Sequence, residues 1–455
     1  MVNDFNRITI IKTILILAIP VVIENFFQMI LGFVDTLFVS KLGLIEVSAV
    51  GVTNAILAVY FAIFMAIGVS ANVYVAKFTG AGQEDKVKKV TSQAILLAVL
   101  AGIVFGIITL FFSKNLLMLM GVEPEVLIAA NSYFRIIGIP SIFISLMFVL
   151  SSVLRGTGDT KSPMMISIFI NLLNILLDYV LIFGFFLIPS LGLEGAAYAT
   201  FISRLVGSVL LILYIYKYKL LEWKSTNWRF DKKMQKEMIS LSSPAAGERL
   251  AMRIGQVLYF GIIVSIGTNT FAAHQIAGNI EVFAYMIGYG FATAATILVS
   301  QSLGSNDKET AKLYATYSLC IGTVFMTCFG AILFIGSEWF ASFFTENPSV
   351  ISEIKIALQI DAFIQPILAI VLILTGVYQG AENTKYPFYL TMFGMWVVRI
   401  IGVYLLGITW EMGIAGIWIA IGLDNLFRGF FLAKNFRNDK WLNRVSPSVE
   451  NGSGA

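Results

Sequence analysis

Twelve long apolar segments follow one another along this chain, and polar turns separate them. They lie near residues 13–40, 47–76, 90–113, 127–154, 163–187, 193–216, 237–266, 271–303, 311–335, 352–379, 386–408 and 413–434. About 20 apolar residues in a helix cross the hydrocarbon core of a bilayer. Inside that core only helices and closed barrels satisfy their own backbone hydrogen bonds. We therefore predict an all-α integral membrane protein with twelve transmembrane helices.

The composition agrees with this prediction and excludes several functions. Of the 455 residues, 58% are hydrophobic and only 13% are charged, so lipid has to cover most of the surface. One histidine cannot supply a His-Glu-x-x-His motif, and two cysteines imply neither a disulfide framework nor a zinc site. No phosphate-binding Gly-x-x-x-x-Gly-Lys-Ser/Thr motif occurs in the sequence. We expect no enzyme, no cofactor and no direct use of ATP.

The lysines and arginines predict the orientation in the membrane. They gather in alternate connections, above all in the basic stretch 217–236, whereas the other connections carry acids such as Glu123 and Glu346. Basic loops remain on the cytoplasmic side. We therefore expect both termini to be cytoplasmic. The basic stretch fixes this topology and attracts anionic lipid, and we expect no nucleic-acid partner.

The two halves of the sequence match at a constant offset of 224 residues. Pro20 falls on Pro244 and Glu24 falls on Glu248. The strongest match pairs Arg155-Gly-Thr-Gly-Asp-Thr-Lys-Ser-Pro163 with Gln379-Gly-Ala-Glu-Asn-Thr-Lys-Tyr-Pro387. Six segments in each half is an even number, so both halves insert with the same orientation and an axis along the membrane normal relates them. Rocking of two such bundles would open a central cleft alternately to each side.

This repeat gives the expected domains. They are an N-terminal six-helix lobe at 1–216, a basic cytoplasmic connecting loop at 217–236, a C-terminal six-helix lobe at 237–440 and a disordered tail at 441–455.

Asp35 is an acid well inside the first apolar segment, and no basic residue lies within one helical turn of it. Ionisable groups at membrane depth are costly and are usually functional. A low dielectric disfavours the charged carboxylate, so this group can bind and release a proton. The alternative is a carboxyl group held by fixed hydrogen bonds. Its equivalent in the second half is Tyr259, so the repeat breaks here.

Asn171, Asn174 and Asp178 form a polar stripe in the fifth segment. Their spacing of i, i+3 and i+7 puts them on one face of a helix, and this face has to meet protein or water. Their oxygens can hold a proton or a hard monovalent cation. Alternatively, the asparagines join neighbouring helices. Both acids lie past the midpoints of outward-running helices, so we expect Asp35 and Asp178 to approach each other and titrate as a coupled pair.

Pro20 removes a backbone hydrogen bond from the first helix and allows it to bend. A bend that depends on the charge of Asp35 would convert protonation into movement.

The second half carries a mixed set of charges inside its apolar segments. They are Glu248, Arg249, Arg253, Glu281, Asp361 and Arg399. Because acids and bases occur together, internal ion pairing is the simpler interpretation, and contact with a substrate is the alternative.

Several motifs together resemble the multidrug and toxic compound extrusion (MATE) family over nearly the whole chain. They are Ile19-Pro20, Phe33-Val-Asp35, Arg155-Gly-Thr-Gly-Asp159, the pair Asn174 and Asp178, Ala273-His-Gln-Ile-Ala277, and Gln379-Gly-Ala-Glu-Asn383. The match is to the branch typified by the DNA-damage-inducible protein F.

The resemblance implies a proton- and cation-coupling site in the first lobe. Its members would be Asp35, Asn174, Asp178 and Thr200, and the first three are also the residues that would bind a sodium ion. Gln28 and Tyr133, together with Asn171, would line the substrate cavity of that lobe. Another bacterial branch has an acid in the tenth helix. It would fall near Leu368, two turns after Asp361, which favours the first-lobe site here.

Family membership implies export of cationic or amphipathic drugs and dyes, driven by a proton or a sodium gradient. We expect a monomer in the cytoplasmic (inner) membrane of a prokaryote, with the lipid bilayer as its surroundings. Two other functions remain open. One is a flippase for lipid-linked precursors from the same superfamily, and the other is a membrane-embedded enzyme.

Overall fold

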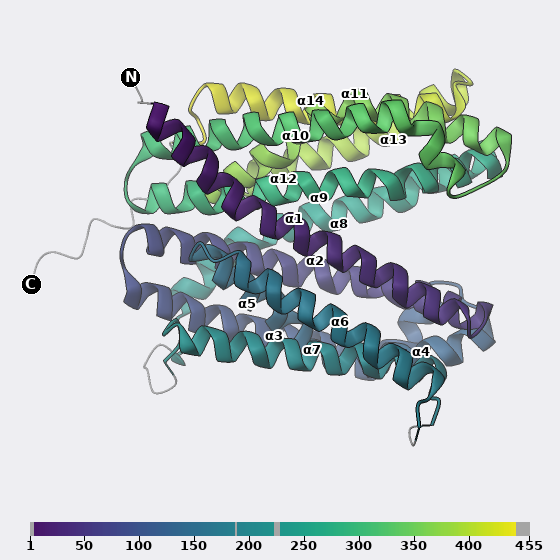
Figure 1. Ribbon diagram of the computed structural model, residues 1–455, viewed down its shortest axis with the longest axis horizontal. Helices are drawn as coiled ribbons and strands as arrows, with labels where there is room; N and C mark the ends of the chain where they lie inside the picture. The colour runs from purple at the N-terminus through teal and green to yellow at the C-terminus, as the bar shows by residue number, and fades with distance from the viewer. Residues whose placement is uncertain (1–3, 187–188, 223–227, 443–455) are drawn as a thin grey trace, which may run out of the picture. The chain divides into compact units, whose positions relative to one another are not determined.

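Long α-helices build the chain in the computed structural model, which describes residues 4–186, 189–222 and 228–442 (Figure 1). The helices are α1 (Asp4–Ser40), α2 (Leu44–Gly80), α3 (Glu84–Leu119), α4 (Pro124–Gly138), α5 (Ser141–Gly156), α6 (Lys161–Phe183), α7 (Gly192–Lys217), α8 (Lys232–Ile266), α9 (Thr268–Gly304), α10 (Lys308–Ser342), α11 (Pro348–Gly380), α12 (Lys385–Phe393), α13 (Ile400–Gly402) and α14 (Gly413–Arg437). Two π-helical stretches, η2 (Gly394–Arg399) and η3 (Val403–Thr409), join α12 and α13 into one continuous crossing.

The helices reproduce the predicted membrane crossings. Eleven helical segments of the described chain are long and apolar enough to cross a membrane. The helices α4 and α5 meet at a 49° bend beside Pro140. Counted as one bent span, this pair is the fourth crossing in chain order and brings the total to twelve. Proline is a common cause of such a kink, because it cannot donate a backbone hydrogen bond. The predicted all-α membrane fold with twelve crossings is confirmed, and its fourth crossing is bent.

Turns after equivalent helices share a backbone conformation even where their residues differ. The φ angle is 66° at Gly82 after α2 and 60° at Asn306 after α9. It is 97° at Gly158 after α5 and 59° at Glu382 after α11. This left-handed region costs a residue with a side chain roughly 1–2 kcal/mol. Asn306 and Glu382 adopt it all the same, so these turns do not depend on glycine. The conformation recurs at turns that join equivalent helices of the two halves.

Gly156 and Gly380, the glycines shared by the two strongest repeat motifs, are packing positions. A Cβ atom on Gly156 would lie 2.7 Å from the carbonyl oxygen of Asn72 in α2. A Cβ atom on Gly380 would lie 2.7 Å from the carbonyl oxygen of Thr296 in α9. Asn72 and Thr296 are themselves 224 residues apart. Each half of the chain therefore uses glycine to bring the same two helix backbones together.

The chain divides into two compact units, and both boundaries lie inside a helix. The C-terminal unit comprises the residues up to Val22 and those from Gly247 onward, and the N-terminal unit comprises Ile23–Ala246. The boundary in α1 comes two residues after Pro20, and the boundary in α8 comes two residues after Pro244. Each proline lies where its helix passes from one unit to the other.

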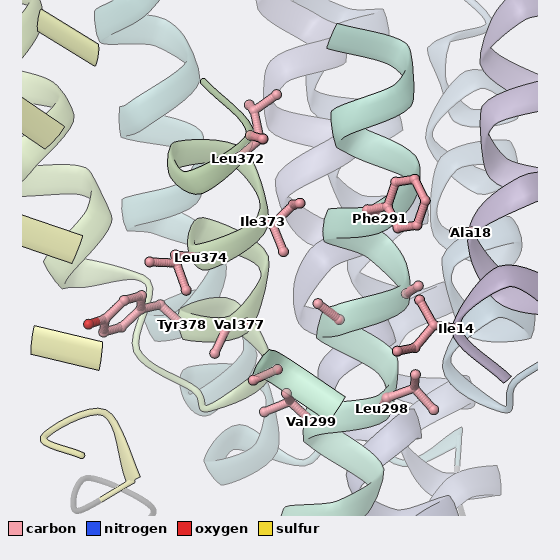
Figure 2. Packing of buried hydrophobic residues seen from close by; sticks show 14 of the residues in the cluster. Ile14, Ala18, Phe291, Leu298, Val299, Leu372, Ile373, Leu374, Val377 and Tyr378 are labelled. Atoms are coloured by element: carbon pink, nitrogen blue, oxygen red, sulfur yellow. The ribbon is translucent and has the colours of Figure 1, made fainter. Parts of the chain in front are cut away.

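The first part of α1 packs in the hydrophobic core of the C-terminal unit. Figure 2 shows Ile14 and Ala18 of α1 beside Phe291 and Leu298 of α9. A Cβ atom on Gly290 would lie 3.0 Å from the carbonyl oxygen of Ala18, so the glycine permits this close approach. Burial of these side chains supplies the stabilising free energy that holds the segment in this unit.

The first part of α8 packs in the N-terminal unit in the corresponding way. The Gln235 side chain donates a hydrogen bond of 2.8 Å to the carbonyl oxygen of Gln93 in α3. Asp231 precedes the helix and accepts a hydrogen bond of 3.0 Å from the backbone N–H of Met234. The Lys89 ammonium lies 2.6 Å from the Asp231 carboxylate, and with that N–H it holds the pKa of Asp231 below its ordinary value.

The division into units differs from the lobes expected at 1–216 and 237–440, because each unit holds the start of the other's first helix. The expected connecting loop 217–236 also contains the first residues of α8, which begins at Lys232. Contacts with α3 extend the ordered helix into the basic stretch.

Most of the expected disordered tail, residues 443–455, lies outside the described residues. Trp441 is fully buried and stacks on Phe436 of α14, with ring centroids 5.5 Å apart. Its large apolar side chain joins the core of the C-terminal unit, so the packed chain extends past the expected limit at residue 440.

Candidate functional site

The polar stripe on α6 faces the interior of the N-terminal unit. Asn171, Asn174 and Asp178 are 7%, 3% and 1% exposed, whereas Leu172 and Leu176 on the opposite face are 57% and 60% exposed. The three polar residues follow helical spacing, so one rotation of α6 buries them all. The Nδ2 atoms of both asparagines are buried and have no hydrogen-bond partner in the described chain.

Asp35 of α1 and Asp178 of α6 come together, as the sequence analysis expected. Their carboxyl groups lie within hydrogen-bonding reach of each other. One oxygen of each, Oδ1 of Asp35 and Oδ2 of Asp178, is buried without a hydrogen-bond partner among the described residues. Two adjacent carboxylates repel each other, and one proton shared between them removes that repulsion. The pair can therefore hold an exchangeable proton.

Tyr133 and Arg204 complete the charged part of the site. Tyr133 of α4 is 7% exposed and interacts electrostatically with both acids and with Arg204. Arg204 of α7 interacts with Asp35 and Tyr133. Sequence reasoning missed Arg204. Its signal was a lone arginine one helical turn after Thr200, at the spacing that puts both on one helix face.

The other predicted site residues of this unit make weaker connections. The Thr200 hydroxyl donates a hydrogen bond of 3.0 Å to the carbonyl oxygen of Ala196 in its own helix. Gln28 of α1 donates a hydrogen bond of 3.5 Å to the hydroxyl of Ser167 in α6. Gln28 therefore joins the two helices that carry the acid pair, whereas the hydroxyl proton of Thr200 is engaged within α7.

Pro20 lies inside α1, which is helical from Asp4 to Ser40, so the bend expected there stays a prediction. Four residues later, the buried carboxylate of Glu24 forms an ion pair of 2.7 Å with Arg155 at the end of α5. This pair fixes the part of α1 that leads to Asp35.

The repeat equivalents of Thr200 and Arg204 form a different site in the C-terminal unit. They are Asp424 and Arg428 of α14. The Asp424 carboxylate accepts a hydrogen bond of 2.9 Å from Nε of Arg428 and another of 2.9 Å from Nε of Arg399. All three side chains are buried. Hydrogen bonds between guanidinium and carboxylate groups are among the strong ones, so the three side chains hold one another in place.

The second-half charges divide between ion pairing and other contacts. Arg399 forms the internal ion pair that was expected, although its partner Asp424 was not among the predicted residues. Glu248 accepts a hydrogen bond of 2.9 Å from Thr391, and Asp361 accepts one of 2.7 Å from Gln365. Arg253 is exposed and donates a hydrogen bond of 3.2 Å to Gln256. Glu281 interacts electrostatically with Arg399, but its Oε1 atom has no hydrogen-bond partner in the described chain.

Metal-binding clusters are not a feature of this fold within residues 4–186, 189–222 and 228–442. No group of three or more histidine, cysteine, aspartate or glutamate residues is arranged there to hold a metal ion. Sodium binding by Asp35, Asn174 and Asp178 stays a prediction.

Comparison with known proteins identifies the fold and the family. The sequence model of the MatE family matches twice, over residues 20–180 and again over residues 244–405. The two matches begin at Pro20 and Pro244, which supports the internal repeat and its offset.

Similar sequences are found in several bacteria. A probable multidrug resistance protein NorM of Thermotoga maritima is 30% identical over 434 residues, which cover 95% of this chain and 94% of that protein. The multidrug resistance protein NorM of Vibrio cholerae is 27% identical over 450 residues, with coverage of 95% and 96%. An uncharacterized transporter, YisQ of Bacillus subtilis, is 26% identical over 426 residues, with coverage of 93% and 94%. These names describe transporters rather than enzymes.

Solved structures share the fold at low sequence identity. A MOP superfamily transporter from Pyrococcus furiosus superposes with a TM-score of 0.89 at 22% identity, covering 96% of this chain and 97% of that chain. A structure described as MATE in the bent conformation gives a TM-score of 0.87 at 22% identity, with coverage of 94% and 96%. With the family model matching more than half of its length, this multi-pass membrane protein belongs to the MatE family of transporters.

Proposed function

We propose that this protein is a secondary active exporter that moves cationic or amphipathic compounds out of the cell in exchange for protons. Relatives that carry the name multidrug resistance protein support the choice of substrate class. The observation that carries the coupling is the approach of the half-buried Asp35 to the buried Asp178 in the N-terminal unit.

The acid pair supports proton exchange for an electrostatic reason. Two carboxyl groups on different helices, α1 and α6, share a proton most readily when they are close together. Loss of that proton leaves two negative charges beside each other. Either a cationic substrate binds and neutralises them, or the two carboxylates move apart. Proton binding and substrate binding therefore compete for one site, and such competition is the basis of exchange.

The position of the acids favours the branch that couples transport in the first lobe. The N-terminal unit contains the acid pair, whereas the equivalent position to Asp35 in the C-terminal unit is Tyr259. The position nearest to the tenth-helix acid of the other branch is Leu368, which is buried and apolar. The names of the relatives do not separate the two branches.

Movement is proposed to start at Pro20. The segment of α1 before the proline belongs to the C-terminal unit, and the segment after it is tied to α5 through Glu24 and Arg155. A change of charge on Asp35 acts on the second segment. A bend at the proline then lets this segment move while the first segment stays in place.

The proposed location is the inner membrane of a prokaryote, with both termini in the cytoplasm. The basic stretch around 217–236 supports this orientation through the positive-inside rule. Reporter fusions at each terminus and in the loop after α7 test it, because all three are then expected to report a cytoplasmic location.

Ethidium efflux from proteoliposomes tests the coupling. Purified protein is reconstituted, and a proton gradient and a sodium gradient are imposed in separate experiments. We expect the proton gradient to drive transport by the wild type and the sodium gradient to have no effect. Asp35→Asn is expected to reduce proton-driven transport to the level of protein-free liposomes, because an amide cannot exchange this proton.

Asp231→Asn is the matched control, since it changes an acid outside the membrane crossings and asparagine still caps a helix. Full proton-driven transport by Asp35→Asn would exclude the proposed role of the acid pair. Transport that follows the sodium gradient alone would assign the site to sodium. A chemical change in the recovered ethidium would point to an enzyme.

A further inference from the structure

Asp361 and Gln365 form a polar pair in α11, inside the C-terminal unit. Both side chains are fully buried, whereas Phe363 on another face of the helix is exposed. The Gln365 side chain donates a hydrogen bond of 2.7 Å from Nε2 to Oδ2 of Asp361. A spacing of four residues puts the two side chains next to each other on the helix surface. The pair belongs to a different unit from the acids Asp35 and Asp178.

The pair lacks one hydrogen-bond donor. Oδ1 of Asp361 and Oε1 of Gln365 are both buried, and neither atom has a hydrogen-bond partner in the described chain. Both atoms are acceptors, and buried polar atoms are nearly always paired. An ionised carboxylate has no hydrogen to donate, whereas a carboxylic acid has one. A proton on Oδ1 that is donated to Oε1 satisfies both atoms and adds a second hydrogen bond beside the first.

No base neutralises a charge on Asp361. None of the ion pairs within residues 4–186, 189–222 and 228–442 includes this residue. The titratable group that acts on it from α9 is Glu281, which is itself an acid. On the side of α14, Arg428 is bound to Asp424. An uncompensated carboxylate at membrane depth is strongly disfavoured, so a neutral acid is the form that suits these surroundings.

The packing of α10 against the pair favours a proton over a larger ion. A Cβ atom on Gly330 of α10 would lie 3.2 Å from Cβ and Cγ of Gln365, so the two helices approach closely here. A hard metal cation takes several oxygen ligands at once, and the pair offers two unpaired oxygens. A shared proton needs only one donor and one acceptor, which the pair supplies.

The repeat shows that the fold provides an apolar environment at this position. The equivalent of Asp361 is Ile137, and the equivalent of Gln365 is Ser141. Ile137 is buried in a hydrophobic cluster of the N-terminal unit. The Ser141 hydroxyl donates its hydrogen bond within the chain to the carbonyl oxygen of Gly138. An acid that replaces isoleucine in such an environment is tolerated best without a charge.

We infer that Asp361 and Gln365 form a proton-binding site, in which Asp361 is a carboxylic acid at neutral pH. The proton comes from the solvent, bonds to Oδ1 of Asp361 and is donated to Oε1 of Gln365, and no other group is consumed or released. This bound proton is part of the folded C-terminal unit and is distinct from the proton of the acid pair. The inference therefore does not depend on the proposed function.

Infrared spectroscopy tests the inference, because carboxylic acids and carboxylates absorb at different frequencies. The spectrum of purified Asp361→Asn in detergent at neutral pH is subtracted from that of the wild type. We expect a carboxylic-acid band in the difference and no carboxylate band. Asparagine can make both hydrogen bonds to Gln365, so this variant is expected to melt at the wild-type temperature. A carboxylate band in the difference would overturn the inference.

Two further variants make the test specific. Glu346→Gln is the matched control, because Glu346 is exposed and its subtraction is expected to show carboxylate bands alone. Gln365→Met removes the amide, so we expect the acid band to move to higher frequency as its carbonyl group loses a hydrogen bond. An unchanged band would contradict the pairing of acid and amide. This comparison also decides the question if Asp361→Asn does not fold.

Repeating the subtraction in sodium chloride and in choline chloride separates a proton from a metal ion. We expect the acid band of Asp361 to be the same in both salts. A carboxylate band from Asp361 that appears in sodium chloride would assign the site to sodium and overturn the inference.

Discussion

The two units of this protein carry equivalent sites with opposite arrangements of charge. In the N-terminal unit the positions are Asp35, Thr200 and Arg204, and Asp178 joins them from α6. In the C-terminal unit the equivalents of the first three are Tyr259, Asp424 and Arg428, and Arg399 joins them from η2. The N-terminal site has two acids and one base. The C-terminal site has one acid held between two bases.

This difference shows that the same repeated fold can carry a structural ion-pair network in one unit and a site that can exchange a proton in the other. The Asp424 carboxylate accepts hydrogen bonds from Arg399 and Arg428, so it acts as a cross-link between η2 and α14. A pair of carboxyl groups with unpartnered oxygens can change its charge. Few substitutions separate the two arrangements, because equivalent helices of the two repeats carry them.

The largest expected effect comes from breaking the fixed site. Asp424→Asn removes the one carboxylate that forms ion pairs with both Arg399 and Arg428, and we expect the free energy of unfolding to fall by about 3–5 kcal/mol. Thr200→Val at the equivalent position removes one hydroxyl that bonds within its own helix, with an expected loss of about 1 kcal/mol or less. Thermal unfolding in detergent measures both. Equal losses for the two variants would contradict the proposed contrast.

A second contrast lies four residues after Pro20 and Pro244. Glu24 pairs with Arg155 at 2.7 Å, whereas its equivalent Glu248 accepts a hydrogen bond from Thr391. Glu24→Gln leaves the arginine without its counter-charge, at an expected cost of about 1.5–3 kcal/mol. Glu248→Gln still accepts the threonine hydrogen bond, so we expect a loss of about 1 kcal/mol or less.

Adding Arg155→Gln to Glu24→Gln checks this interpretation, because glutamine already stands at the equivalent position 379. Recovery of part of the lost thermal stability is expected. A double variant that is less stable than the sum of the single variants predicts would argue against a simple ion pair.

The third prediction concerns positions where the units are alike. Gly156→Ala and Gly380→Ala each place a methyl group against a carbonyl oxygen of a neighbouring helix. We expect both to destabilise the protein by about 1–3 kcal/mol through overpacking. Similar losses in a thermal unfolding assay would sharpen the comparison, since they would show that the shared packing is equally strong in both units. A loss of stability at only one of the two positions would show that the shared packing is not equally strong in the two units.

The smallest expected effect is at the start of α10. Asp307 accepts a hydrogen bond of 2.9 Å from the backbone N–H of Thr310. Hydrogen bonding from the Thr310 side chain, together with this backbone contact, holds the pKa of Asp307 below its ordinary value. The lowered pKa means that the ionised form stabilises the fold at neutral pH and that this contribution is lost as the pH falls through the lowered pKa. Asp307→Ala is expected to cost about 1 kcal/mol at neutral pH.

Gln83, the equivalent residue before α3, makes no such cap, so Gln83→Ala is the matched control and is expected to change little. Thermal unfolding measured from neutral to acidic pH should show the stability of Asp307→Ala approaching that of the wild type. A gap that stays constant over this range would exclude the carboxylate as its source.

Sequence reasoning worked best where the signal is local to one helix. The spacing of Asn171, Asn174 and Asp178 fixes their common face, whatever α6 packs against. The apolar segments fixed the number of crossings because lipid allows only helices of a certain length. The bend at Pro140 was not predicted, because a kink depends on the neighbours that fill the space beside it.

Sequence reasoning was weakest where a contact joins distant helices. Arg204 and Asp424 were overlooked because their roles depend on the rotation of α7 and α14 toward other helices. The passage of α1 and α8 between the units was also missed. Nothing local distinguishes a helix that stays in one unit from a helix that divides its contacts between two.

The sequence by itself determined the membrane class, the twelve crossings, the repeat and its offset, and the acids that stand without local partners. These features follow from hydropathy, spacing and internal comparison, which are properties of neighbouring residues. The tertiary structure alone decided that Asp35 meets Asp178, that Arg204 faces them and that Arg428 does not meet an equivalent acid pair. Those outcomes depend on how helices far apart in the chain pack, and a buried charge acquires its role from the groups that packing brings beside it.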